Sequence, residues 1–280
     1  MGAIVAIKRL ARPLIQKKAL RIIQKQVELL SGLRHPNILQ FYGFSYDSIN
    51  ICIVSEYMPG GDLHAVLHNT SVELLWSDPL LQIATDVALG MCYLHQRNIV
   101  HRYLKSTNLL CSDTYGCKVS DFGFSKHGTA DMRTVIENSY YLAPEMIRKE
   151  PYTRKVDSYA FGIILIELET RNDPYFDFHL TKMQVLNLVS RGFLPNIPKK
   201  CLPYRKALIL DCLEFDPKLR PSMKDILGRL QGDVGAEINL DIQITLKRRR
   251  VRNKKFQRQK RFNPTLLQEL LSSENDSGER

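Results

Sequence analysis

The sequence has few of the features that mark secreted, metal-rich or membrane-spanning proteins. Its six cysteines are scattered over 280 residues without a C-x-x-C pair, so free thiols in a reducing compartment are the simplest interpretation. The first ten residues have no long apolar core of the kind found in secretory signals. The longest apolar stretch, residues 159–168, includes Glu167 and is too short to cross a bilayer. We therefore expect no transmembrane segment and a cytoplasmic protein, with the nucleus as the alternative location.

Positive charge is concentrated near the end of the chain. Forty Lys and Arg against 29 Asp and Glu give a formal net charge of +11, and ten of the basic residues, with no acidic one, fall in residues 247–261. This basic run has three interpretations: a nuclear-import signal, a contact with nucleic acid or an anionic membrane, or a solvated disordered tail. Phe256 is the only aromatic residue in this run, which is too little aromatic surface for stacking on bases.

The hydrophobic pattern changes from strands to helices along the chain. Three strands are expected, at residues 3–8, 38–42 and 51–56, and a helical stripe runs from Pro13 to Leu30 between the first two. Pro59-Gly60-Gly61 then forms a linker. Beyond it we expect helices around residues 62–68, 78–97, 144–149, 156–171, 181–191, 203–213 and 222–231. Strands followed by helices predict two lobes with a cleft between them.

Eight short motifs follow one another in a fixed order. They are V-A-I-K (5–8), H-P-N-I (35–38), S-E-Y-M (55–58), H-R-Y-L-K-S-T-N (101–108), D-F-G (121–123), A-P-E (143–145), D-S-Y-A-F-G (157–162) and D-P-K-L-R-P (216–221). Each motif alone is weak evidence, because a short strand or turn can carry it by chance. Together they resemble protein kinases of the tyrosine-kinase-like group, in its serine/threonine lineage, over about residues 3–231.

The resemblance implies an α+β, two-lobed protein kinase-like fold with a truncated sheet in the N-lobe and a helical C-lobe. Residues 1–231 would form the kinase-like domain, lacking its first two strands, and residues 232–280 a C-terminal tail. The tail begins with a strand-like segment that is apolar at every even position from Val234 to Leu246. A truncated sheet has an open edge that can accept a further strand, and residues 238–246 are a candidate for it through exchange between two molecules. The alternative is a strand that packs on the large lobe or a disordered tail.

The same resemblance assigns roles to single residues. The implied nucleotide-binding residues are Lys8, Gln26, Ser55, Glu56, Met58 and Leu110, with adenine held by the backbone of Glu56 and Met58. The implied magnesium ligands are Asn108 and Asp121. Residues 101–108 resemble the catalytic loop of the family, and Lys105 within them indicates the serine/threonine lineage. Arg220 is expected to pair with Glu145. ATP and Mg²⁺ are the implied cofactors, and proteins are the implied substrates or partners.

One residue of the catalytic loop departs from the family pattern. The family has H-R-D-L-x-x-x-N, and its aspartate accepts the proton of the substrate hydroxyl. Here Tyr103 occupies that position. A carboxylate with a pKa of about 4 is ionised at neutral pH, whereas a phenol with a pKa of about 10 keeps its own proton. Tyr103 therefore marks the position of a missing base.

Two further departures concern the phosphates of the nucleotide. Counting nine residues back from His35 places Gln26 where the family has the glutamate that pairs with Lys8, so the pair would lose its charge. Only seven residues precede Lys8, whereas the Gly-rich loop of the family would lie about twenty residues upstream. We expect that loop to be lacking; a missing first exon is the other explanation.

Three functions follow from these observations. The first is a signalling pseudokinase or a severely impaired serine/threonine kinase, in which phosphate clamping and proton transfer are impaired, binding of ATP and Mg²⁺ is weakened, and the framework is kept. The second is an active serine/threonine kinase that transfers phosphate from ATP. The third is a nuclear or nucleic-acid-associated protein that acts through the basic tail.

Overall fold

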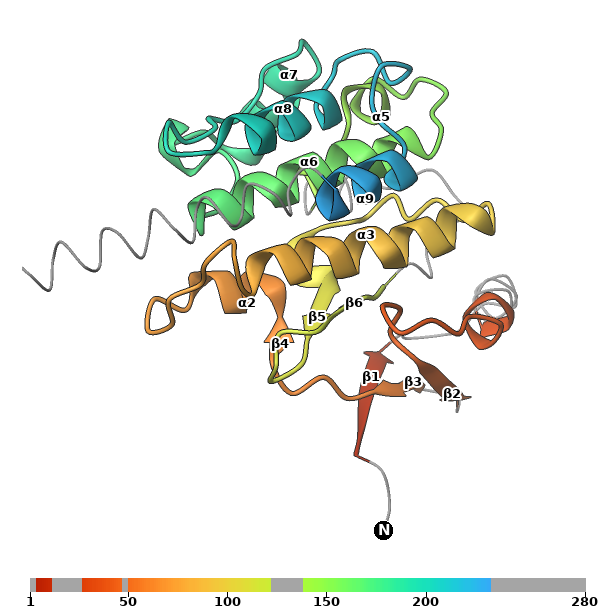
Figure 1. The fold of residues 1–280 in the computed structure, drawn as a ribbon. Coiled ribbons are helices and arrows are strands. Elements are labelled where there is room, and N and C mark those ends of the chain that lie inside the picture. The colour runs from red at the N-terminus through yellow and green to blue at the C-terminus, as the bar shows by residue number, and fades with distance from the viewer. Residues whose placement is uncertain (1–3, 12–26, 47–49, 122–137, 233–280) are drawn as a thin grey trace, which may run out of the picture. The chain divides into compact units, whose positions relative to one another are not determined.

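The computed structural model describes residues 4–11, 27–46, 50–121 and 138–232 (Figure 1). The chain runs first through a small antiparallel sheet and then through a mainly helical part, as the sequence predicted for an α+β, two-lobed fold. The predicted strand-like segment and basic run, at residues 234–261, lie outside the described residues.

The small lobe is built on three described strands. These are β1 (Val5–Ala11), β2 (Phe41–Tyr46) and β3 (Asn50–Glu56), with β3 in the centre of the order β1-β3-β2. Both pairings are antiparallel, and the register places Lys8 of β1 opposite Ile53 of β3. Of the helix predicted between the first two strands, residues 27–31 are described and are helical.

The prediction of a strand at residues 38–42 is wrong in its boundaries, because β2 begins only at Phe41. Ile38 instead forms an isolated parallel bridge with Val119 of the large lobe. The Leu39 N–H donates to the Val119 carbonyl at 2.9 Å, and the Val119 N–H donates to the Asn37 carbonyl at 2.9 Å. Ile38 is only 2% exposed. The apolar residues before Phe41 therefore join the two lobes rather than extend the sheet.

The helical predictions for the large lobe are confirmed to within a few residues. The helices are α2 (Leu63–His68), α3 (Leu80–Gln96), α5 (Pro144–Ile147), α6 (Lys155–Thr170), α7 (Lys182–Val189), α8 (Pro203–Cys212) and α9 (Met223–Gln231). Thr181 and Ser222 are the N-cap residues of α7 and α9, and each forms a capping box. The cap side chain accepts the backbone N–H three residues on, and the side chain of that third residue accepts the backbone N–H of the cap. Helix α6 is buried along almost its whole length and forms the centre of this lobe, with α3 and α9 packed together and α8 against α6 (Figure 1).

A second small sheet was not predicted. It consists of β4 (Gly61–Asp62), β5 (Leu109–Cys111) and β6 (Cys117–Val119), in the order β4-β5-β6. Strands of two or three residues are too short for an alternating pattern to show in the sequence. This sheet carries the residues that follow the catalytic loop, and it ends just before Asp121.

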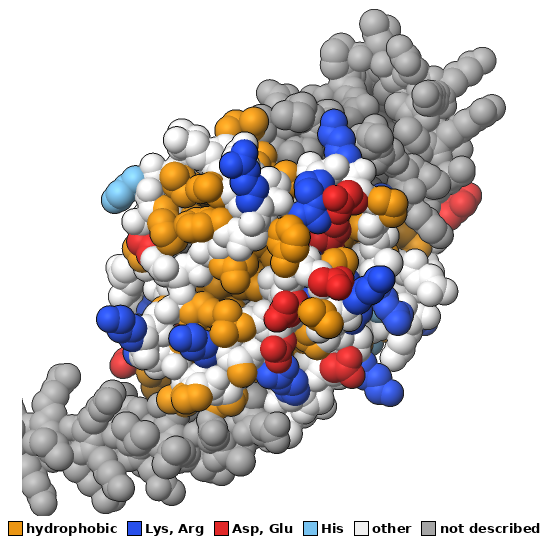
Figure 2. All heavy atoms as spheres, turned by 90° about the horizontal axis from the view of Figure 1, so that it is seen from above, with side chains coloured by type: hydrophobic (Ala, Val, Ile, Leu, Met, Phe, Trp, Pro, Cys, Tyr) orange, Lys and Arg blue, Asp and Glu red, His pale blue; other side chains and the backbone are white. Residues whose placement is uncertain are grey.

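The surface of the large lobe over α7 and α8 mixes both signs of charge with scattered hydrophobic side chains (Figure 2). Exposed apolar residues of this lobe include Met183 on α7, Leu210 on α8, Phe215 and Leu219. In the described part of the chain, no helix combines the length and apolar character that crossing a bilayer requires.

Candidate active site

The catalytic loop is anchored on one buried carboxylate. Asp157, in the first turn of α6, accepts the backbone N–H of His101 at 2.9 Å and that of Arg102 at 2.8 Å. His95 at the end of α3 makes a third contact, with Nε2 at 2.8 Å from Asp157 Oδ2. Asp157 is 0% exposed, so these bonds replace its lost hydration. They also hold Arg102 at a φ of +70°, a conformation that costs a non-glycine residue free energy.

The His101 ring fixes the backbone on both sides of the loop. Its Nε2 lies 3.0 Å from the Ser120 carbonyl, which only accepts, so Nε2 carries the proton. Its Nδ1 accepts the backbone N–H of Tyr103 at 3.2 Å. Burial lowers the pKa of His101, with the negative charge of Asp157 opposing that shift. Both hydrogen bonds and the lowered pKa indicate that the imidazole is neutral.

Tyr103 is therefore held in place by its backbone from two sides. Its N–H binds His101, and its carbonyl accepts the side-chain amide of Asn108 at 2.7 Å. The residue is half-buried. The loop thus has a phenol at the position where the resemblance expects a carboxylate, and its backbone there is held by His101 and Asn108.

The two predicted magnesium ligands lie on neighbouring segments. Ser120 donates both its N–H and its hydroxyl to the Asn108 carbonyl, each at 2.9 Å, and Asp121 follows directly. Asp121 has a φ of +59°, again in the left-handed region. A carboxylate and an amide oxygen are hard donors of the kind that Mg²⁺ prefers, so the donor set fits this ion.

Lys8 contacts one of these predicted ligands directly. Its Nζ lies 3.0 Å from Asp121 Oδ1, and the two side chains are 54% and 38% exposed. An ion pair this exposed contributes about 0–1 kcal/mol to stability. Gln26, the residue predicted to pair with Lys8, lies outside the described residues. The structure thus brings Lys8 to Asp121 across 113 positions of sequence.

The remaining residues predicted to bind nucleotide lie in β3, directly after β3, and in β5. Ser55 lies in β3 between Ala6 of β1 and Phe41 of β2, and Met58 follows β3 as a buried residue. Leu110 is the middle residue of β5 and is half-buried. These positions remain predictions as binding residues.

Glu56 has a contact that the sequence did not reveal. Its carboxylate accepts both hydrogen bonds from Lys118 Nζ, at 2.6 and 2.7 Å, and its backbone N–H donates to Gln40. Lys118 belongs to β6, so this half-buried ion pair joins the small lobe to the large one. The partners are 62 residues apart, and no spacing rule of the sequence could have paired them.

Behind the loop lies a second buried group that sequence reasoning missed. Ser106 donates to Glu167 Oε1 at 2.9 Å and lies 3.0 Å from the Tyr141 hydroxyl. Burial raises the pKa of Glu167 to about 8, although hydrogen bonds from Ser106 and Tyr141 oppose the shift. Lys105, just before Ser106, is half-buried.

One predicted ion pair is confirmed. Arg220 binds Glu145 through two parallel hydrogen bonds of 2.6 and 2.9 Å, and the two side chains are 0% and 2% exposed. Arg220 also donates to the Glu214 and Phe215 carbonyls. This buried, bidentate pair fixes the end of the segment that leads from Asp121 to α5.

Comparison with known proteins identifies the family. The model of the family described as "Protein tyrosine and serine/threonine kinase" matches residues 2–230. A Dictyostelium discoideum protein named "Probable serine/threonine-protein kinase drkA" is 40% identical over 235 residues, covering 82% of this chain and 36% of its own length. Its relative drkB gives 40% identity, with 82% of this chain and 34% of its own length covered. The Arabidopsis thaliana "Serine/threonine-protein kinase STY17" is 37% identical over 229 residues, covering 81% of this chain and 40% of its own length.

The chain thus spans well under half the length of the relatives that it matches. The match nevertheless covers the sheet, the catalytic loop and the large lobe described above. With a family model that extends over residues 2–230, this chain belongs to the protein tyrosine and serine/threonine kinase family.

Proposed function

We propose that this kinase-family chain acts as a signalling pseudokinase with little or no phosphoryl transfer of its own. The observation that carries the proposal is Tyr103. Its backbone is held by His101 and Asn108 within an ordered loop, so the substitution changes the chemistry at this position rather than the shape of the loop.

The chemical argument concerns proton transfer. A base at this position takes up the proton of the attacking hydroxyl, and such assistance is worth about 10²–10⁴-fold in rate. A neutral phenol cannot take up that proton at physiological pH, since its pKa is about 10. The hydrogen bonds to the Tyr103 backbone involve no atom of the phenol ring.

Weakened binding of ATP and Mg²⁺ is part of this proposal. Asn108 and Asp121 would hold the metal ion and Lys8 the phosphates, and the bound ion would neutralise charge on the phosphoryl group. Lys8 and Asp121 are paired with each other, and at about 0–1 kcal/mol this pair is easily exchanged for a nucleotide. We therefore expect nucleotide to bind while the transfer step stays slow.

An active serine/threonine kinase is the second candidate. It is favoured by the names of the similar Dictyostelium and Arabidopsis proteins. It is also favoured by Lys105, a residue typical of the serine/threonine lineage at this position of the loop. The loss of the base alone leaves room for slow turnover, because phosphoryl transfer depends mainly on positioning and charge stabilisation.

Transfer of radioactive phosphate from ATP separates the two candidates. The measurement compares the unmodified chain with Asn108→Ala, which lacks a predicted metal ligand, and with Tyr103→Asp. We expect the unmodified chain to label itself and a generic protein substrate no faster than Asn108→Ala does. Tyr103→Asp should raise transfer by about 10²-fold or more, because it restores a carboxylate.

The comparison with Asn108→Ala also provides the contrary outcome. If the unmodified chain transfers phosphate well above that variant, the pseudokinase proposal is wrong and the active-kinase candidate is correct. Thermal unfolding with ATP, in the presence and absence of Mg²⁺, measures nucleotide binding independently of turnover.

A further inference from the structure

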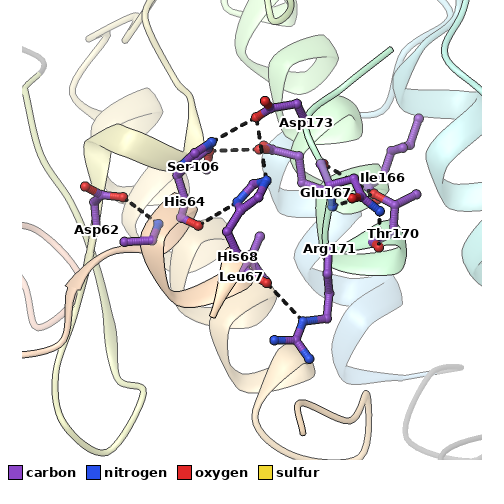
Figure 3. Close-up of polar contacts among 12 residues, drawn as sticks. Asp62, His64, Leu67, His68, Ser106, Ile166, Glu167, Thr170, Arg171 and Asp173 are labelled. Atoms are coloured by element: carbon purple, nitrogen blue, oxygen red, sulfur yellow. Dashed lines mark hydrogen bonds and ion pairs between the residues drawn. The ribbon is translucent and has the colours of Figure 1, made fainter. Parts of the chain in front are cut away.

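Two histidines and an aspartate meet on the large lobe, close to the buried Ser106 and Glu167 (Figure 3). His64 and His68 belong to α2, and Asp173 follows the end of α6. His64 Nε2 lies 2.8 Å and His68 Nε2 3.8 Å from Asp173 Oδ1, and the two imidazole rings stack with their centroids 4.0 Å apart. Figure 3 shows both rings turned toward the Asp173 carboxylate. We refer to these three residues as the histidine cluster.

The spacing of the two histidines suits a chelating pair. Residues four apart on an α-helix lie on the same face, one turn above the other. The three potential ligand atoms all lie within 4.8 Å of one another. Zinc bound tetrahedrally at about 2.0–2.1 Å from nitrogen or oxygen requires ligand atoms about 3.3 Å apart. The observed 2.8 and 3.8 Å lie on either side of that separation. Small side-chain rotations, with release to solvent of the proton that His64 Nε2 donates to Asp173, would close the site.

A hydrogen bond already prepares His68 as a ligand. Its Nδ1 lies 2.8 Å from the His64 backbone carbonyl. Because a carbonyl only accepts, Nδ1 carries the proton, and in the neutral ring Nε2 is left with the lone pair that faces Asp173. Histidines that bind metals commonly donate their second ring N–H to a carbonyl or carboxylate in this way, which fixes the tautomer and the ring orientation.

The two segments that supply the cluster are also tied together. Arg171 lies between α6 and Asp173, and its guanidinium donates to the carbonyls of Leu67, Asn69 and Val72 around the end of α2 (Figure 3). The side chain of Asp62 caps the start of the same helix by accepting the Ala65 N–H at 2.9 Å. The three ligands are thus supported by a framework that holds α2 against the loop after α6.

We propose that the histidine cluster binds a divalent first-row transition metal, with Zn²⁺ as its representative. Two imidazoles and one carboxylate suit zinc, whereas Mg²⁺ and Ca²⁺ prefer sets of oxygen ligands. The three side chains are 36%, 33% and 53% exposed, so water can occupy a fourth position and the ion can exchange. The metal would fasten α2 to the loop after α6 and is distinct from the Mg²⁺ expected at Asn108 and Asp121.

Calorimetric titration of the full chain with Zn²⁺, in excess Mg²⁺, tests the proposal. We expect one ion per chain, and His64→Ala, His68→Ala and Asp173→Asn should each weaken binding at least tenfold. His179→Ala is the matched control, since His179 is exposed on the same lobe and outside the cluster; its affinity should equal that of the unmodified chain. Circular dichroism of each variant without metal verifies that it is folded.

Two results would overturn the proposal. One is a chain that takes up no Zn²⁺, or whose cluster variants bind it as tightly as the unmodified chain does. The other comes from substituting Co²⁺, since a thiolate charge-transfer band would place the ion on cysteines such as Cys52 or Cys92, which are free and partly exposed. Neither readout depends on phosphoryl transfer, so failure here is distinguishable from failure of the pseudokinase proposal.

Discussion

At the scale of a single residue, the protonation of Glu167 makes the stability of the fold depend on pH. Its pKa in the folded protein is about 8, raised by burial from an ordinary 4.5, and one carboxyl oxygen has no hydrogen-bond partner. Between these two values the folded chain holds a proton that the unfolded chain has released. The free energy of unfolding therefore falls as pH rises through this window.

Glu167→Gln removes this dependence, because an amide is neutral at every pH and resembles the protonated acid in shape. At about pH 8 we expect the variant to be more stable than the unmodified chain, on the order of 1–3 kcal/mol. At about pH 5 the two should differ little. Urea unfolding at several pH values measures both curves, with Glu214→Gln as an exposed control. Parallel curves for the unmodified chain and Glu167→Gln would show that Glu167 is ionised in the fold.

At the scale of an element, the junction between β3 and β4 depends on a glycine. A Cβ at Gly60 would lie 2.8 Å from the Cys111 carbonyl oxygen and closer still to that of Ser112. The Gly60 N–H also donates to the Cys111 carbonyl at 2.9 Å. Any larger residue therefore pushes β4 away from β5.

Gly60→Ala should destabilise the fold by about 2 kcal/mol or more, since backbone atoms cannot move aside as a flexible side chain can. Gly43→Ala is the matched control, because a Cβ there meets nothing within 4 Å and the change should be close to neutral. Denaturant unfolding of both variants measures the difference. Equal stability of the two would mean that the approach of Gly60 to β5 is not required.

How far the elements could be predicted depends on their length and on the distance between partners. Helix α9 follows from periodicity and its capping residue, α6 from a long apolar stretch, and the Glu145–Arg220 pair from motif order. The short strands β4–β6, the Glu56–Lys118 pair and the contacts of Asp157 did not follow from the sequence. The pairing of β4 with β5 and the contacts of Glu56 and Asp157 join residues 48 to 62 positions apart, while β5 and β6 pair over only 6 to 10 positions but are three residues long. No local pattern encodes such pairings.

At the scale of the whole molecule, the sheet of the small lobe has an edge that bears on assembly. β1 lies at one side of the three described strands, and Ile4 and Ile7 are 77% and 62% exposed. An edge strand with free backbone groups and apolar side chains accepts further strands. The sequence predicts such a strand at residues 238–246, and exchange of this segment between two molecules remains our hypothesis for self-association.

Deletion of residues 234–280 tests this hypothesis through the molecular mass in solution. If the tail of one molecule adds to the β1 edge of another, the full chain should be dimeric and the shortened chain monomeric by light scattering. Ile7→Lys in the full chain should have the same effect, because a charged side chain on an edge strand opposes strand addition. An oligomeric state that neither change affects would exclude strand exchange. Loss of dimers in the deletion but not in Ile7→Lys would instead assign association to the tail alone, since the β1 edge would then take no part.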